Sequence, residues 1–141
     1  DKIMNNIIWL QPNDTLAVTS IWIDQPSDEH AELLLSRGDV PSDWQVLAYD
    51  VVDFPTWKRQ EDWVWSNGKI EVDFDRAKES TKERLRIERQ GLLQDLDIQF
   101  QRAQETKSST TRIVAEKERL RDITNLVDDC TTLEELEELT V

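Results

Sequence analysis

The sequence predicts an α+β protein in two parts: a small antiparallel β-rich unit with one short helix over residues 1–74, and a helical region over residues 75–141. Nine of the ten aromatic residues and all four prolines lie in the first part. The second part is rich in Glu, Arg, Lys, Gln and Leu, which favour helices, whereas aromatic and β-branched residues favour strands. This change in composition places the predicted domain boundary at residue 74.

Two apolar segments at the start of the chain, residues 3–10 and 16–23, predict an antiparallel hairpin, because a Gln-Pro-Asn-Asp turn separates them. A short helix is expected next, with Ser27 as its N-cap and Gly38 as its C-terminal stop. Residues 44–52 are apolar and β-prone, so they predict a third strand.

The segment WVWSNGKIEV, residues 63–72, carries the strongest local signal. Its Asn-Gly pair is the preferred sequence for a two-residue type I′ turn, which fixes the register of the two strands. That register gathers apolar side chains on one face, and a one-residue slip would turn them to water. The expected aromatic core consists of Trp63, Trp65, Ile70, Val72 and Phe74. Trp57, beside Lys58-Arg59, is the tryptophan that we expect to be exposed.

The second part predicts an antiparallel helical hairpin. A long helix begins near Phe74-Asp75, the TKSSTT segment at residues 106–111 interrupts it, and a second helix of roughly 18 residues follows. Thr132-Leu-Glu-Glu135 is a capping-box pattern that opens a short acidic helix. Because two helices bury little surface alone, we expect helix–helix or subunit contacts, and hence a homo-oligomer, through Leu85, Leu92, Leu96, Phe100, Leu120 and Ile123.

The chain has 141 residues and a net charge of −13. The first 74 residues carry 5 basic and 14 acidic side chains, whereas residues 75–127 are slightly basic. This balance argues against direct binding to nucleic acid. The sequence contains no apolar run of membrane-spanning length and no visible signal peptide, so we expect no membrane partner. Asp1-Lys2-Ile3, ahead of Met4, resembles the remnant of a cleavable tag.

The sequence has few residues of the types used for catalysis or metal binding. We therefore expect a non-enzymatic protein without metal or cofactor. The single histidine, His30, is expected to be a surface or capping residue. The single cysteine, Cys130, is expected to be half-buried, with its pKa raised by the preceding aspartates. Asp50 and Asp53 are the best-placed carboxylates for acid–base work, but no nucleophile, phosphate loop or metal motif accompanies them.

Two further functions remain open on the residues alone. The acidic charge could mimic DNA and so inhibit a nucleic-acid enzyme, which predicts a continuous carboxylate stripe on one face. The tryptophans could stack on sugars in a carbohydrate-binding module, which predicts two exposed coplanar rings.

Residues 84–105 and 113–124 resemble the C-terminal region of the phage tail assembly chaperone family and related tail-fibre-adjacent proteins. Residues 39–55 and 61–79 are similar to N-terminal units that precede such helices in some phage proteins. The resemblance implies a non-enzymatic role in tail or tail-fibre assembly, a tail protein as partner, and a location in the host cytoplasm during assembly or in the virion tail. The matching positions are Arg86, Glu88, Arg89, Leu92, Leu93, Asp97, Leu120, Arg121 and Asp122.

Overall fold

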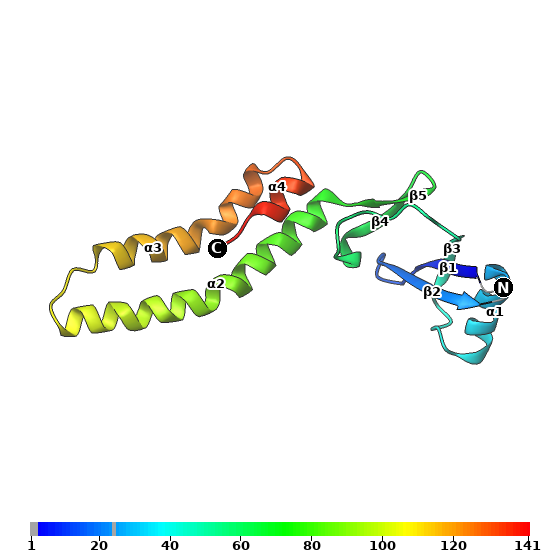
Figure 1. Cartoon of the computed structure of the whole chain (residues 1–141), viewed down its shortest axis with the longest axis horizontal. Coiled ribbons are helices and arrows are strands. Elements are labelled where there is room, and N and C mark those ends of the chain that lie inside the picture. The colour runs from blue at the N-terminus through cyan, green and yellow to red at the C-terminus, as the bar shows by residue number, and fades with distance from the viewer. Residues whose placement is uncertain (1–2, 24) are drawn as a thin grey trace. The chain divides into compact units, whose positions relative to one another are not determined.

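A computed structural model describes residues 3–23 and 25–141, with side chains over residues 6–20 and 25–141. The chain divides into two compact units, Asp1–Asp73 and Phe74–Val141. The first holds antiparallel strands and one α-helix, and the second holds helices (Figure 1), which confirms the predicted α+β class. Of the expected tag remnant, Asp1 and Lys2 lie outside the described residues.

Three strands form the sheet of the first unit, in the order β2-β1-β3. Strands β1 (Ile3–Leu10) and β2 (Leu16–Ile23) pair antiparallel, as their apolar patterns predict. Strand β3 (Gln45–Tyr49) pairs with the other edge of β1 and is shorter than the predicted strand over residues 44–52.

The early end of β3 has a long-range cause. Asp50 adopts a left-handed backbone conformation, with φ of 55°, which turns the chain out of the strand. The buried side chain of Asn6 then binds both backbone groups of Val51, as a residue of a neighbouring strand would. Its Nδ2 donates to the Val51 carbonyl over 2.6 Å, and its Oδ1 accepts from the Val51 N–H over 2.8 Å. Both backbone groups of Val51 are thereby satisfied without a further strand residue.

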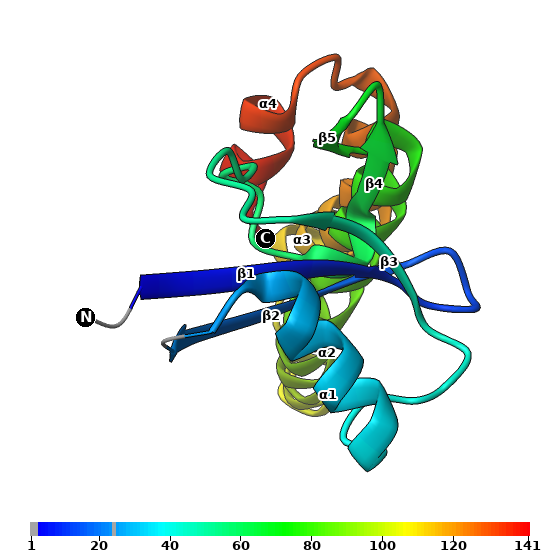
Figure 2. The same ribbon diagram turned by 90° about the vertical axis from the view of Figure 1, so that its right-hand side faces the viewer.

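Helix α1 (Ser27–Arg37) packs against this sheet (Figures 1 and 2). It ends as predicted at Gly38, whose left-handed φ of 76° suits glycine. The predicted cap by Ser27 is wrong, because Pro26 occupies the N-cap position. The Ser27 hydroxyl is buried and donates to Asp50 Oδ1 over 2.6 Å. Between sheet and helix lies a core of Ile7, Trp9, Ala31 and Val40.

A second, two-stranded sheet consists of β4 (Trp63–Ser66) and β5 (Lys69–Val72), preceded by the short 3-10 helix η1 (Gln60–Asp62). Trp65 pairs with Ile70 and Trp63 with Val72, so the predicted register is confirmed. The turn residues Asn67 and Gly68 have φ of 53° and 78°, as a type I′ turn requires.

The second unit is a helical hairpin with a short C-terminal helix (Figure 1). Helix α2 (Phe74–Glu105) is followed by α3 (Thr111–Asp122), the 3-10 helix η2 (Ile123–Asp129) and α4 (Leu133–Glu138). The predicted second helix of roughly 18 residues is therefore divided, because its last turns tighten into the 3-10 form at Ile123.

Local capping explains where these helices begin and end. After α2, the Lys107 N–H donates to the Gln104 carbonyl and the Ser108 N–H to the Ala103 carbonyl, with Lys107 at φ of 58°. This pattern is a Schellman motif. At α4, Thr132 Oγ1 accepts from the Glu135 N–H over 3.2 Å, as the capping box predicts.

Candidate protein-interaction site

The face of α2 that the sequence singles out lies largely inside the second unit. Leu85, Leu120 and Ile123 are buried and share this core with Val127 and Leu136. These side chains join α2 to α3, η2 and α4 within one chain. They are not at the surface, so a second subunit cannot reach them while the hairpin is folded.

Farther along α2 the same face becomes more open. Leu96 and Phe100 are half-buried, and Leu92 is 42% exposed. The ammonium of Lys117 on α3 lies 5.2 Å from the centre of the Phe100 ring and pairs with Asp97 on α2. A cation–π contact and an ion pair thus hold this part of the hairpin together.

Two arginines of α2 cap the ends of the neighbouring helices. Arg84 donates to the carbonyls of Leu136 and Leu139 at the end of α4, over 3.2 and 2.7 Å. Arg89 donates to the carbonyls of Leu120 and Arg121 at the end of α3, over 3.2 and 2.8 Å. Carbonyls at a helix C-terminus lack helical partners and carry partial negative charge, so both contacts are favourable.

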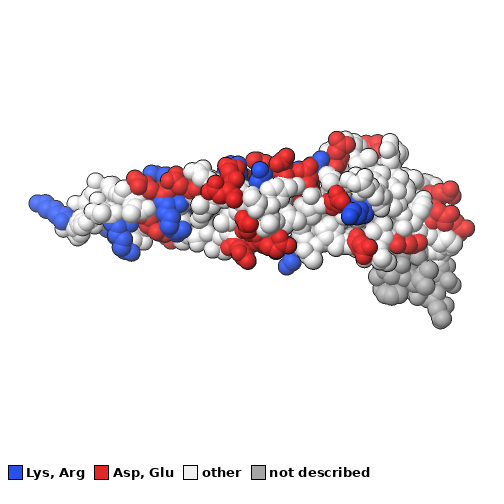
Figure 3. Space-filling view, turned by 90° about the horizontal axis from the view of Figure 1, so that it is seen from above, with Lys and Arg blue, Asp and Glu red and all other residues white. Residues whose placement is uncertain are grey.

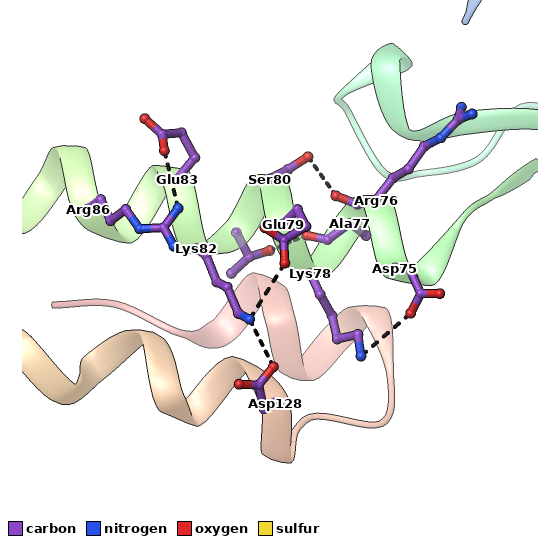
Figure 4. Close-up of polar contacts among 11 residues, drawn as sticks. Asp75, Arg76, Ala77, Lys78, Glu79, Ser80, Lys82, Glu83, Arg86 and Asp128 are labelled. Atoms are coloured by element: carbon purple, nitrogen blue, oxygen red, sulfur yellow. Dashed lines mark hydrogen bonds and ion pairs between the residues drawn. The ribbon is translucent and has the colours of Figure 1, made fainter. Parts of the chain in front are cut away.

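A third cation of α2 reaches η2 (Figure 4). The ammonium of Lys82 lies 3.0 Å from Asp128 Oδ1 and 3.6 Å from Glu79 Oε1. The hydrogen bond to Asp128 raises the pKa of Lys82, with partial burial acting in the opposite direction. The figure also shows Asp75 with Lys78 and Glu83 with Arg86, pairs one helical turn apart on α2.

The opposite side of α2 carries exposed apolar residues that the sequence analysis does not single out. Ile87 is 64% exposed and Ile98 is 49% exposed. Gly91 lies between them, and a Cβ built on it would meet nothing within 4 Å. We call the set Ile87, Gly91, Gln94 and Ile98 the outer α2 stripe. Its signal in the sequence is a spacing of four, three and four residues, which keeps the set on one side of a helix.

The predicted aromatic core divides by burial, and its last member, Phe74, belongs to the second unit. Trp63 and Ile70 are buried, while Trp65, Val72 and Phe74 are half-buried. Phe54 packs on Trp63, with ring centres 6.1 Å apart.

The prediction that Trp57 is exposed is wrong, since only 8% of this residue is accessible. Its Nε1–H donates to the buried carboxylate of Asp62 over 2.8 Å, and its carbonyl accepts from Trp63 Nε1 over 2.8 Å. The ring N–H and the backbone carbonyl of Trp57 are thus satisfied inside the first unit, which offsets the cost of burying them.

The single histidine is also placed differently from the prediction. His30 is 6% exposed on α1, and its buried Nδ1 has no hydrogen-bond partner. Cys130 is half-buried, and burial, together with the charges of Glu135 and Asp129, raises the pKa of its thiol. Asp50 accepts the Ser27 hydroxyl, and Asp53 lies exposed in the segment that follows.

The described residues contain no group of three or more His, Cys, Asp or Glu side chains placed to hold a metal ion. Among them, no helix combines the length and apolar character needed to cross a bilayer. Comparisons of the chain with models of protein families, with curated proteins and with solved structures found no match.

Proposed function

We propose that this protein is a non-enzymatic assembly or structural component of a bacteriophage tail, and that it acts by binding another tail or tail-fibre protein through its helical hairpin. The sequence resemblance supplies the phage context. Exposed apolar side chains on the second unit support binding as the mode of action.

One observation carries the proposal: large apolar side chains are exposed along a hairpin whose other exposed positions are mostly charged or polar. An isolated exposed apolar residue is ordinary, but five of them distributed over α2, α3 and η2 of one helical unit favour contacts with another protein. They are Ile87, Leu92, Ile98, Val114 and Leu126.

The charge distribution favours this function over DNA mimicry. Figure 3 shows acidic and basic residues interspersed along the hairpin. Many form pairs within one helix, such as Glu116 with Arg119, rather than a continuous carboxylate stripe. DNA mimicry therefore has less support than binding through mixed polar and apolar contacts.

A carbohydrate-binding module also has less support. Among the described tryptophan side chains, Trp9, Trp57 and Trp63 are buried, and Trp44 and Trp65 are half-buried. The rings of Trp9 and Trp44 are tilted by 59°, so they offer no flat platform.

The proposal is tested by deleting the gene from the phage that encodes it and supplying variants from a plasmid. We expect defective tails by electron microscopy, restored by the wild-type protein. The double variant V114E/L126E, which changes two exposed hairpin residues, should fail to restore them. The matched control V52E changes an 88% exposed residue of the first unit and should restore tails. Normal tails without the gene would overturn the proposal.

A further inference from the structure

Helix α4 contacts the rest of the chain much as a bound peptide would (Figure 1). Its N-terminal cap is built from its own segment: the Glu135 carboxylate accepts the N–H and hydroxyl of Thr131, and the Glu135 N–H donates to Thr132 Oγ1. Its buried side chain is Leu136. Within the described part of the chain, the hydrogen bonds that reach it from another helix come from Arg84, which donates to two carbonyls at its C-terminal end. An apolar anchor and helix-end carbonyls therefore hold α4 in place.

The site that α4 occupies is already formed on α2. Arg84 binds the α4 carbonyls through Nη2, while its Nη1 lies 3.2 Å from Glu88 Oε1 on α2. Because a guanidinium is planar and rigid, this ion pair keeps Nη2 aimed at the site when α4 is absent. The remaining acidic side chains of α4 are exposed and pair with no cation among the described residues: Glu134, Glu137 and Glu138. The site therefore recognises an inward leucine and a helix end, and not the glutamates.

The hairpin has contacts that hold it together without α4. The ion pair of Lys117 with Asp97 joins α3 to α2. The ion pair of Lys82 with Asp128 joins α2 to η2. Departure of α4 thus uncovers its site and leaves these contacts in place.

The tether of α4 explains why so few contacts suffice. Residues 130–132 are all that separates it from η2. A short tether gives an effective concentration on the order of millimolar, so a weak contact keeps α4 docked. A longer helix from another protein buries more apolar surface than one leucine, and it can therefore displace α4.

We propose that α4 is an autoinhibitory cover, and that the site beneath it binds the C-terminal turn of a helix from the partner protein. The helix that fits has a leucine facing α2 and free carbonyls at its end, because these features hold α4. When α4 leaves, Arg84 has an unoccupied donor beside apolar surface, and the partner helix fills both. The inference rests on the proposed function, because it specifies which part of a partner the hairpin binds.

A labelled peptide with the sequence of residues 131–141 tests the site in the full chain. The variant E137P interrupts α4 and leaves every residue of α2 unchanged. We expect the peptide to bind E137P at least about tenfold more tightly than the wild type, because apparent affinity falls with the fraction of molecules whose site is open. Fluorescence anisotropy, with the protein titrated to millimolar concentration, measures this. L136E, which removes the apolar anchor of α4, should bind the peptide as E137P does.

Two double variants locate the bound peptide. E137P/R84Q removes the guanidinium and should bind the peptide about tenfold more weakly than E137P, because hydrogen bonds from a charged donor are strong. E137P/I98E changes the outer α2 stripe, away from the site, and should bind as E137P does. A peptide that carries the L136E change should not bind.

Equal peptide binding by the wild type and E137P would overturn the inference, because α4 would then not cover the site. Absence of binding by both E137P and L136E would overturn it as well. Circular dichroism should show a helical hairpin in both variants, and unfolding of both would contradict a site that survives the departure of α4. The proposed tail function is judged separately, by V114E/L126E and tail formation, neither of which involves α4.

Discussion

The indole of Trp57 donates its hydrogen to the buried carboxylate of Asp62, five residues away, over 2.8 Å. The same tryptophan accepts the indole hydrogen of Trp63 on its backbone carbonyl. Asp62 also accepts the Asp73 N–H on its own carbonyl over 2.8 Å, at the end of the second hairpin. These contacts join the segment before β4 to the residue after β5.

Replacing Trp57 by phenylalanine should destabilise the first unit by about 1.5–3 kcal/mol, because a buried carboxylate loses a hydrogen-bond donor. Urea unfolding followed by tryptophan fluorescence measures the change. W65F is the matched control. It makes the same substitution at a half-buried tryptophan and leaves the Trp57 donor of Asp62 in place. A W57F variant as stable as W65F would contradict the role given to this hydrogen bond.

The two sides of α2 should respond differently to truncation. L120A removes a buried side chain from the core that α2 and α3 share, and we expect a loss of about 2–5 kcal/mol in the free energy of unfolding. I98A, on the exposed side, should change the stability of the monomer by less than about 0.5 kcal/mol. Chemical unfolding at low protein concentration, followed by circular dichroism, compares them. Similar losses in both variants would mean that Ile98 is buried in the folded monomer.

Lys107 should be a position where glycine stabilises the hairpin. Its φ of 58° lies in the left-handed region, which costs a residue with a Cβ about 1–2 kcal/mol. We expect K107G to raise the free energy of unfolding by about 1 kcal/mol, after the added flexibility of the unfolded chain is subtracted. Thermal unfolding checks this. K107A is the control, because it removes the charge and keeps the Cβ; equal gains in both variants would point to charge instead.

The ion pair between Lys82 and Asp128 should make the stability of the second unit depend on alkaline pH. The hydrogen bond to Asp128 raises the pKa of Lys82 in the folded state. The stabilisation that this ion pair gives is therefore fully present below the ordinary lysine pKa of about 10.4. It is lost as the pH rises through the higher folded value, because the unfolded chain releases the proton first. The free energy of unfolding, measured across this pH range, should decline less steeply in D128N than in the wild type. Identical pH profiles would contradict a stabilising ion pair between Lys82 and Asp128.

Several elements follow from local sequence alone. The Asn67-Gly68 turn sets the register of β4 and β5 because few other two-residue sequences adopt positive φ at both positions. Gly38 and Thr132 mark helix boundaries through hydrogen bonds within one turn. In each case the decisive contact lies within a few residues in the sequence.

Other features depend on contacts that no local pattern contains. β3 ends early because Asn6, 45 residues away, binds the backbone of Val51. The apolar stripe of α2 indicates one buried face, but periodicity does not say what covers it. In the structure, α3, η2 and α4 of the same chain cover Leu85, so the surface open to partners lies elsewhere.

The capping of α4 by Arg84 bears on the order in which the protein opens. A helix of six residues does not persist alone in water, so α4 depends on what it docks against. Its carbonyl contacts with Arg84 span 52 and 55 residues, and its single buried side chain is Leu136. A segment held by so few distant contacts undocks before the hairpin unfolds. The amide protons of α4 should therefore exchange with solvent ahead of those in the buried turns of α2, so that α4 opens while the rest of the hairpin stays folded.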